Sequence, residues 1–335
     1  MEYRSFGRTG MKVSPLCMGC MYFGAKTPED EAFELFDACI DAGINFFDTA
    51  NVYSRGVSES VLGRILAKRG NRDRLVIATK VHGRMADDDP NAQGNSRRHI
   101  IDQCEASLKR LGVDHVDLYQ IHRPDSSVPI DETLRALDDL VRSGKVRYIG
   151  TSTYSAWQSV EALWAARELG LNRFVSEQPP YNIADRRIER ELLPMARTYG
   201  YGIIPWSPLA GGLLTGKYGR DKAPEGARYA NPEQPHLARR VTEPLYDALD
   251  ELEKLVAEKG VAMSQFALAW VMQQPGITSP IIGSRTMEQL KDNLAALEVT
   301  ITDEDRARVD EIVPPGTMVS PFYEADWGPH PQRVL

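Results

Sequence analysis

Three observations predict that this chain is an α/β protein, an eight-stranded parallel (β/α)8 TIM barrel. Short apolar runs alternate with amphipathic helical patterns along most of its length. Successive runs are separated by close to the roughly 30 residues that a parallel strand and its crossover helix need. Eight such runs occur, near residues 16–20, 44–48, 75–80, 116–122, 146–151, 173–178, 201–206 and 278–282.

Capping residues predict where the intervening helices begin. Thr27 is expected to be the N-cap of the first helix, with Pro28 in its first turn. Ser96 is expected to cap a later helix, and Ser155 with Gln158 has the spacing of a capping box.

Three segments fall outside the regular alternation. Residues 1–15 predict a β-hairpin that closes the floor of the barrel. Between the seventh and eighth strands, a Pro/Gly-rich stretch at 219–235 is followed by helical patterns near 243–260 and 264–273. Insertions of this length usually act as lids or binding loops. The tail at 314–335 has no predicted structure, and the whole chain is expected to form a single barrel domain.

The composition is that of an ordinary soluble globular protein, with 42% hydrophobic and 26% charged residues and a net charge of −7. No basic cluster is dense enough to indicate nucleic-acid binding, and no apolar stretch reaches the roughly 18 residues of a membrane span. The four cysteines fit neither a disulfide framework nor a zinc site, so we expect a cytoplasmic protein. The oligomeric state is left open.

Four residues lie at or just beyond the ends of the second, third and fourth runs: Asp48, Tyr53, Lys80 and His122. Taken singly, each has an ordinary structural explanation. In a parallel barrel, however, the carboxyl ends of the strands meet at one rim, where active sites lie. A neighbouring ammonium lowers the pKa of a tyrosine from its usual value near 10, which makes the phenol a suitable acid for protonating a carbonyl oxygen. The four residues therefore predict a carbonyl reductase.

The loops after the last two strands predict a phosphate-binding site. The chain has no G-x-G-x-x-G motif after a strand, so a Rossmann domain is not indicated. Barrels commonly bind phosphate after strands seven and eight, near a helix N-terminus. Here these loops contain the glycine-rich segment 206–212 and the segment Gly283-Ser284-Arg285-Thr286.

The order and spacing of Asp48, Tyr53, Lys80 and His122 resemble the catalytic tetrad of the aldo-keto reductase superfamily. The surrounding runs at 43–50 and 117–122 resemble the same family, and the similarity extends from about Gly7 to Asn293. The resemblance implies that Tyr53 is the general acid, that Lys80 and Asp48 tune it, and that His122 orients the carbonyl.

The resemblance also implies NADPH (NADP⁺) as the cofactor, because an arginine suits its 2′-phosphate. Compared with many members of the family, Thr153 replaces an asparagine and Gly283 replaces a lysine. The implied cofactor contacts are Trp206 stacked on the nicotinamide, Ser152 and Gln178 at its carboxamide, Ser207, Leu209 and Gly211 at the pyrophosphate, Ser284 and Arg285 at the 2′-phosphate, and Gln289 and Asn293 near the adenine.

The predicted activity is NADPH-dependent reduction of an aldehyde or ketone, such as an aromatic aldehyde or a keto sugar, to the alcohol. Tyr22, His82 and Arg123 are the main candidates for contacts to the small-molecule carbonyl substrate, with Arg84 and the tail aromatics Phe322, Tyr323 and Trp327 as further ones. One alternative is a cofactor-sensing regulatory subunit resembling ion-channel β-subunits. Another is a metal-dependent barrel hydrolase that uses His82, His122 and Asp48. The physiological substrate and the preferred direction stay open.

Overall fold

The computed structural model describes residues 1–220, 229 and 235–323. Most of the Pro/Gly-rich stretch predicted at 219–235, and the tail from residue 324 with Trp327, lie outside the described residues.

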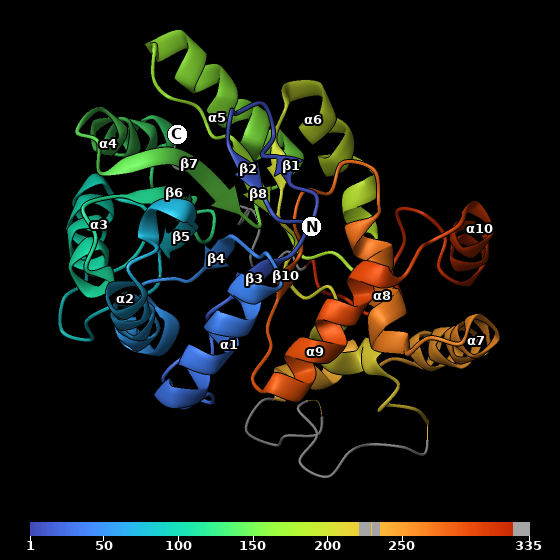
Figure 1. The fold of residues 1–335 in the computed structure, drawn as a ribbon. Coiled ribbons are helices and arrows are strands. Elements are labelled where there is room, and N and C mark those ends of the chain that lie inside the picture. Colours follow the sequence, from blue (N-terminus) through green and yellow to red (C-terminus); the bar gives the residue numbers. More distant parts are fainter. Residues whose placement is uncertain (221–228, 230–234, 324–335) are drawn as a thin grey trace.

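Eight parallel strands form one curled sheet with helices around its outside (Figure 1). The strand order is β10-β3-β4-β5-β6-β7-β8-β9, and a parallel bridge between Ile203 and Ile277 joins β9 to the segment before β10. All eight predicted strands are present in the predicted order, so the barrel fold is confirmed. The strands are β3 (Cys17–Gly19), β4 (Phe46–Asp48), β5 (Val76–Val81), β6 (Val116–Ile121), β7 (Val146–Ser152), β8 (Ser176–Gln178), β9 (Gly202–Ile203) and β10 (Ile281–Ile282).

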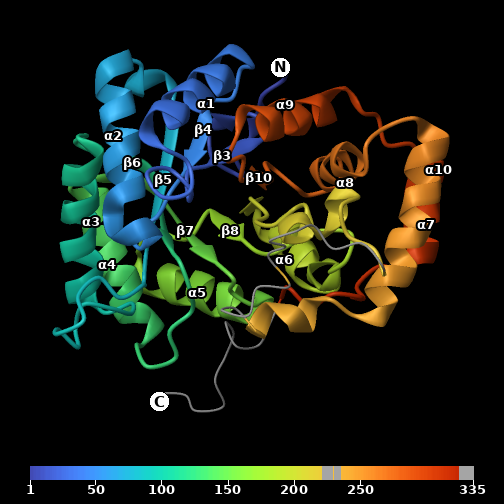
Figure 2. The ribbon, with the colours of Figure 1, turned by 90° about the horizontal axis from the view of Figure 1, so that it is seen from below.

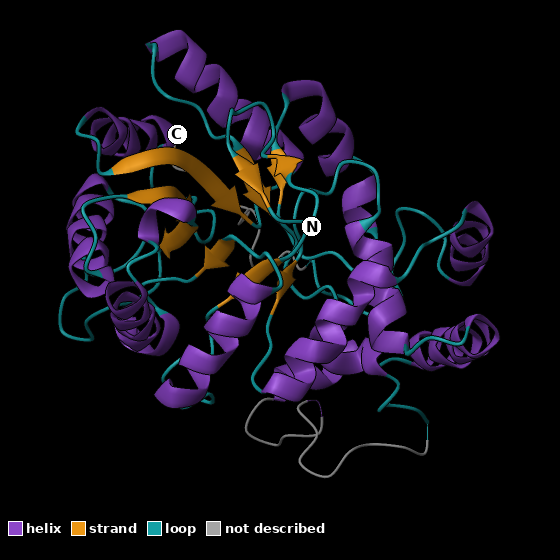
Figure 3. Ribbon diagram, viewed as in Figure 1, coloured by secondary structure: helices purple, strands orange, loops and turns teal. Residues whose placement is uncertain are grey.

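The helices form the outer layer, and the short strands lie inside their ring (Figure 3). The two helices predicted in the insertion after the seventh strand are α7 and α8. Others, including α2 and α10, were not predicted. The α-helices are α1 (Glu29–Asp41), α2 (Val57–Arg69), α3 (Arg97–Leu111), α4 (Ile130–Arg142), α5 (Ala156–Leu169), α6 (Leu192–Tyr199), α7 (Glu243–Lys259), α8 (Met263–Met272), α9 (Met287–Ala295) and α10 (Asp303–Ile312).

Two of the three predicted caps are confirmed. Ser96 accepts the backbone N–H of His99, and Ser155 with Gln158 forms the capping box before α5. The prediction for Thr27 is wrong. Pro28 occupies the N-cap position of α1, and the buried Thr27 hydroxyl donates instead to the carbonyl of Arg285 at 3.1 Å. A buried hydroxyl needs a partner, and the loop after β10 supplies one.

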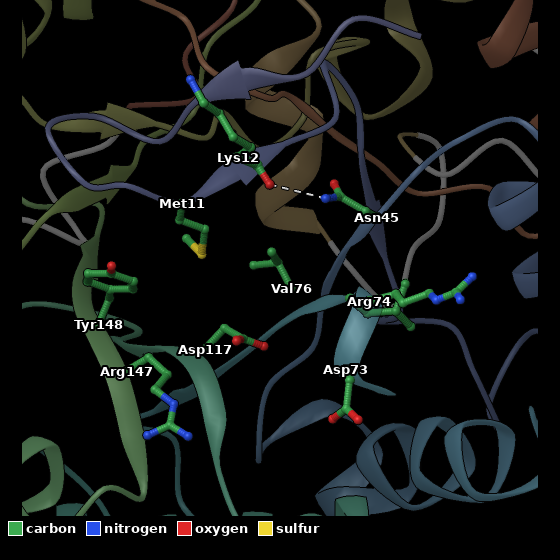
Figure 4. Close-up of a pocket in the computed structure, with 10 residues that line it drawn as sticks. Met11, Lys12, Asn45, Asp73, Arg74, Val76, Asp117, Arg147 and Tyr148 are labelled. Atoms are coloured by element: carbon green, nitrogen blue, oxygen red, sulfur yellow. Dashed lines mark hydrogen bonds between the residues drawn. The ribbon is translucent and has the colours of Figure 1, made fainter. Parts of the chain in front are cut away.

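The N-terminal hairpin closes the floor of the barrel, as predicted. It consists of β1 (Arg4–Ser5) and β2 (Lys12–Val13), which pair antiparallel. Between them, the fully buried Phe6 packs edge-on against Phe46 of β4, with 5.8 Å between the ring centres. Asn45 fixes the hairpin to the barrel, because it accepts Ser14 N–H at 2.8 Å and donates to the Lys12 carbonyl at 3.1 Å. Figure 4 shows the hollow of about 480 Å³ at this end, with the Asn45–Lys12 bond.

The barrel interior changes character between its ends. Near the floor it is filled by an apolar cluster that includes Phe6, Phe46 and Leu118. Towards the carboxyl ends of the strands, buried side chains are charged or amide-bearing, as at Asp48 and Lys80. All four cysteines are free thiols and buried. The polar end of the interior is therefore where the predicted chemistry is placed.

The last described segment is held against the loops that surround the barrel. Backbone N–H groups of Phe322 and Tyr323 donate to Asp185 at 2.6 and 2.8 Å. Phe322 is fully buried with the Arg240 guanidinium 4.2 Å from its ring centre, so it packs in the core. In Figure 2, α7 and α10 run together at the edge remote from α2 and α3. None of the described helices combines the length and the apolar character needed to cross a bilayer.

Candidate functional site

The side chain of Lys80 is at the centre of the site. It is fully buried on β5, and its Nζ donates to Asp48 Oδ1, to the Thr49 carbonyl at 2.8 Å and to the Tyr53 hydroxyl at 3.2 Å. A buried ammonium is stable only when it is paired and hydrogen-bonded. Three acceptors around one ammonium satisfy this requirement, and they bring Asp48, Tyr53 and Lys80 together.

A left-handed turn after β4 positions Tyr53. The segment Tyr53–Gly56 is a 3₁₀ turn, in which Ser54 and Arg55 have φ of 50° and 51° and Gly56 has φ of 92°. A Cβ on Gly56 would lie 2.6 Å from Arg110 Cδ and would displace that side chain, in addition to straining the backbone at this φ. The turn leaves the Tyr53 ring centre 4.9 Å from Lys80 Nζ.

Asp48 is held by two amides as well as by the ammonium. Its Oδ2 accepts Gln120 Nε2 at 3.0 Å and Gln178 Nε2 at 3.1 Å, and Gln178 also donates to Gln120 Oε1 at 3.2 Å. The sequence patterns do not predict Gln120 as a site residue. The sequence feature that points to Gln120 is an amide side chain within an apolar strand, on the same face as Leu118, where a buried amide needs a hydrogen-bond partner. In this structure Gln178, which was predicted to contact the cofactor, belongs to the Asp48 network.

His122 completes the group of four. Its ring centre lies 5.6 Å from that of Tyr53, at an interplanar angle of 84°. Burial, with help from the positive charges of Arg123 and Lys80, lowers the pKa of His122 well below its ordinary value. Burial alone would also lower the pKa of Lys80, but Asp48 and Tyr53 outweigh it and raise that pKa. At neutral pH the site therefore has a neutral imidazole and a charged ammonium.

Backbone strain is concentrated around this group. The described residues other than glycine with positive φ are Ser54, Arg55, Thr153, Ser207 and Ala210. All five lie in loops that follow β4, β7 or β9, at the carboxyl ends of the strands. Non-glycine residues in the left-handed region cost free energy and tend to cluster at functional sites. The strain thus marks the same rim as the four side chains.

The loop after β9 contains the segment predicted to bind pyrophosphate. Ser207 and Ala210 have φ of 54° and 50°, and Gly211 and Gly212 follow with φ of 63° and 109°. Backbone turns of this kind present N–H groups to anions in other proteins. Here the N–H groups of Ala210 and Gly212 donate within the loop, to the carbonyls of Ser207 and Leu209 at 2.9 and 2.8 Å. The indole N–H of Trp206 is buried and has no hydrogen-bond partner among the described residues. This unusual run and the unsatisfied donor fit an elongated polar ligand.

The loop after β10 leads into the N-terminus of α9, which Thr286 caps. Ser284 is buried and its hydroxyl accepts Asn293 Nδ2 at 2.9 Å, while the Arg285 N–H donates to Gln289 Oε1 at 2.9 Å. The Arg285 side chain is exposed, so its guanidinium is accessible to a ligand. A cationic side chain at a helix N-terminus suits a phosphate.

The predicted substrate residues are in separate places. Arg123 is next to the tetrad and donates to Thr153 Oγ1 at 3.1 Å and to Ser152 Oγ at 3.5 Å. His82 lies at the end of β5 with its Nδ1 3.0 Å from Asn95 Oδ1. Tyr22 is beside Arg285, whose guanidinium carbon lies 5.8 Å from the centre of the Tyr22 ring. The sheet order places β4 and β5 between the strands that precede Tyr22 and Arg123.

The metal-hydrolase alternative has little support in the geometry. Within residues 1–220, 229 and 235–323, no group of three or more His, Cys, Asp and Glu side chains is arranged to hold a metal ion. Both oxygens of Asp48 are already engaged, by Lys80 on one side and by Gln120 and Gln178 on the other.

Comparison with known proteins identifies the family. The model of the Aldo/keto reductase family matches residues 15–314. A Bacillus subtilis (strain 168) protein named an uncharacterized oxidoreductase is 42% identical over 322 residues, covering 94% of this chain and 96% of the relative. A probable voltage-gated potassium channel subunit beta of Oryza sativa subsp. japonica is 38% identical, and the match covers 93% of this chain and 97% of that relative. A putative aryl-alcohol dehydrogenase of Schizosaccharomyces pombe is also 38% identical, covering 92% and 95%. The chain belongs to the aldo/keto reductase family and is an NAD(P)H-dependent oxidoreductase.

Proposed function

We propose that this protein reduces an aldehyde or ketone to the alcohol with NADPH, and that Tyr53 delivers the proton to the carbonyl oxygen. The observation that supports this most strongly is the 3.2 Å distance between the Tyr53 hydroxyl and the buried Nζ of Lys80. Proton transfer leaves a phenolate on Tyr53. The adjacent ammonium, which is fully buried, stabilises that negative charge.

The other members of the tetrad keep this arrangement in place. Asp48 holds Lys80 charged, and Gln120 and Gln178 fix Asp48 in turn. His122 is neutral, since its pKa lies well below the ordinary value. It acts as a hydrogen-bond donor that orients the substrate oxygen towards Tyr53, without competing as a second acid.

The cofactor is held, in this proposal, by the loops after β9 and β10. When bound, it supplies the hydride that goes to the carbonyl carbon. Trp206 would pack on the nicotinamide, with Ser152 and Gln178 at the carboxamide. The pyrophosphate would be bound by Ser207, Leu209 and Gly211. The adenosine 2′-phosphate end would be bound by Ser284, Arg285, Gln289 and Asn293. Gln178 would share its amide between Asp48 and the carboxamide.

The preference for NADPH over NADH rests on Arg285. Its exposed guanidinium offers paired donors that match a phosphate. Arg285→Gln should weaken NADPH binding by about 10- to 100-fold, the loss expected for charge-assisted hydrogen bonds, and leave NADH binding nearly unchanged. Fluorescence titration of both cofactors measures this. Lys291→Gln is the matched control, because it removes an exposed positive charge from α9, the helix that follows Arg285. Equal weakening of both cofactors would place Arg285 away from the 2′-phosphate.

His82 and Arg123 are proposed to line the substrate pocket. Both border a cavity of about 630 Å³, which among the described residues reaches the tetrad only through Arg123, the residue after His122. Tyr22 does not border this cavity; it lies beside Arg285, at the proposed 2′-phosphate end of the cofactor. A pocket of this size accepts an aromatic aldehyde or a keto sugar.

A second candidate function is a cofactor-sensing regulatory subunit. It is favoured by the 38% identity to a relative named a probable voltage-gated potassium channel subunit beta. The same tetrad and cofactor loops would then serve as a redox sensor. The two candidates differ in turnover, since a sensor binds NADPH tightly but oxidises it slowly with every carbonyl compound.

The deciding experiment is a steady-state assay of NADPH absorbance with a panel of aromatic aldehydes, ketones and keto sugars. Catalytic turnover of at least one class, at more than about 1 s⁻¹, is expected for the reductase. Tight NADPH binding with no multiple turnover on any compound, together with recovery of a stable protein partner, would favour the sensor.

A further inference from the structure

The cavity beside the tetrad is rich in hydrogen-bond donors. It occupies about 630 Å³ between the loop after β5 and the loop after β6. Arg84, Arg123 and His82 are on its wall, with the serines Ser96 and Ser127. Two arginines therefore border this space, and Arg123, the residue after His122, links it to the tetrad, whose own side chains are not among the lining residues.

Arg123 connects this cavity to the catalytic group. It follows His122 directly and donates from Nη1 to the His122 carbonyl at 2.7 Å and to Thr153 Oγ1 at 3.1 Å. Its guanidinium carbon lies 5.9 Å from the centre of the Trp206 ring. These contacts fix the guanidinium at the border between the cavity and the tetrad. Burial lowers the pKa of Arg123 to about 10, so it is still a cation at neutral pH.

The one acid among the described residues that line this cavity is Asp125. Burial would raise its pKa, but hydrogen bonds from Ser127 and Asn95 lower it, so Asp125 is ionised and offsets one of the two arginine charges. Asp125 accepts the backbone N–H of Asn95 at 3.0 Å and both the N–H and the hydroxyl of Ser127, at 3.0 and 2.5 Å. Its oxygens thus serve to shape the loop. His82 is neutral, because burial lowers its pKa. Beyond the wall, burial raises the pKa of Glu177 to about 8, so this nearby carboxyl is mostly protonated at neutral pH.

We propose that the preferred substrate carries an oxyanion, a carboxylate or a phosphate, which Arg123 holds while the carbonyl is presented to Tyr53 and His122. The planar fork of a guanidinium matches either group. Arg84 lies at the exposed side of the cavity and adds a second positive charge. The oxyanion itself is unchanged in the reaction: the aldehyde gains a hydride from the cofactor and a proton from Tyr53.

The proposal rests on the reductase function above and concerns selectivity, so its test compares substrates that differ in charge. One pair is 4-formylbenzoate with 4-formylbenzamide, and the other is glyceraldehyde 3-phosphate with glyceraldehyde. The readout is the ratio of kcat/KM for the anionic member to that for the neutral one. Wild type should favour at least one anion by about 10-fold or more, and the preferred pair tells carboxylate from phosphate.

Arg123→Gln should bring this ratio down to about 1, because one partner of the charge-assisted contact is removed. Arg123→Lys should retain part of the ratio, since it keeps the charge and loses the fork. The ratio cancels any loss that both substrates share, such as a change in cofactor binding. Arg98→Gln is the matched control, because Arg98 is an exposed cation on neighbouring α3 and does not line the cavity. Its ratio should equal that of wild type.

A preference of wild type for the neutral members, or an unchanged ratio in Arg123→Gln, would overturn the proposal. If no carbonyl compound is reduced at all, the proposed function fails, and calorimetry still tests the site. Benzoate should then bind NADP⁺-loaded wild type more tightly than benzamide does, and this difference should be lost in Arg123→Gln. Equal binding of the two compounds would contradict the oxyanion site by itself.

Discussion

The two ends of the barrel are built from the same eight strands but differ in the residues that occupy left-handed backbone conformations. At the floor, where the helices end, left-handed conformations are taken by glycines such as Gly112, Gly144 and Gly170. At the rim, serine, threonine, arginine and alanine take them as well as glycines such as Gly56 and Gly211. Where a left-handed residue only connects elements, glycine avoids the strain. Where a side chain or a fixed loop is needed for chemistry, the strained residue is kept.

Charged pairs show the same contrast. At the floor, Arg72 and Asp117 are paired at 2.8 Å with their side chains 16% and 18% exposed, and Asp117 also accepts the Ile77 N–H at 2.8 Å. This pair ties loops to strands. At the rim, the Lys80–Asp48 pair is 0% and 1% exposed and includes a tyrosine hydroxyl. A fully buried charge pair is a weak source of stability, which favours a chemical reason for keeping it.

The largest expected effect comes from breaking the rim pair. Lys80→Met should lower kcat/KM by about 10²- to 10⁴-fold and destabilise the fold by about 3–5 kcal/mol, because Asp48 is left as a buried unpaired charge. Urea unfolding and steady-state assays measure both. The double variant Lys80→Met/Asp48→Asn should recover much of the stability and none of the activity. Recovery of activity in the double variant would mean that Lys80 only neutralises Asp48.

A pH-dependent loss of stability is expected from Glu177, another buried rim acid. Burial raises its pKa to about 8, against hydrogen bonds from Thr151 and Tyr154. At a pH between the unfolded-state and folded-state pKa values, the folded protein therefore keeps the Glu177 proton, whereas the unfolded chain has released it. This group's contribution to stability should fall as pH rises from about 5 to 8, by several kcal/mol at about 1.36 kcal/mol per pKa unit.

The measurement is the difference in unfolding free energy between wild type and Glu177→Gln as a function of pH. The glutamine does not titrate, so the difference isolates this carboxyl. Wild type should lose stability relative to the variant across that interval. A constant difference would show that Glu177 is ionised throughout.

The smallest expected effects come from replacing a left-handed glycine at the floor and a left-handed non-glycine residue at the rim. Gly112→Ala at the floor should cost about 1–2 kcal/mol, because its φ is 65°, and leave kcat/KM unchanged. Thr153→Gly at the rim should change stability by less than about 1 kcal/mol. It should lower kcat/KM by about tenfold, since an acceptor for Arg123 is lost. The opposite pattern would mean that the rim strain has no connection with activity.

The sequence was informative wherever a strand fixed the position of a side chain. Asp48, Lys80 and His122 follow apolar runs, and parallel strands bring their ends together whatever lies between them. Gln120 was not found, because its partner Asp48 is 72 positions away in the chain and depends on the curl of the sheet. Thr27 was assigned as a cap because local spacing allowed it, but a carbonyl 258 positions away took its hydroxyl.

The central claim is that Tyr53 supplies the proton, and Tyr53→Phe tests it most directly. The substitution removes one oxygen atom and keeps the ring that packs near His122 and Lys80. The single-turnover rate of NADPH oxidation, measured with saturating carbonyl substrate, should fall by about 10²- to 10⁴-fold while the Kd for NADPH stays within about threefold of wild type. An unchanged single-turnover rate would contradict the account, because the proton would then come from another group.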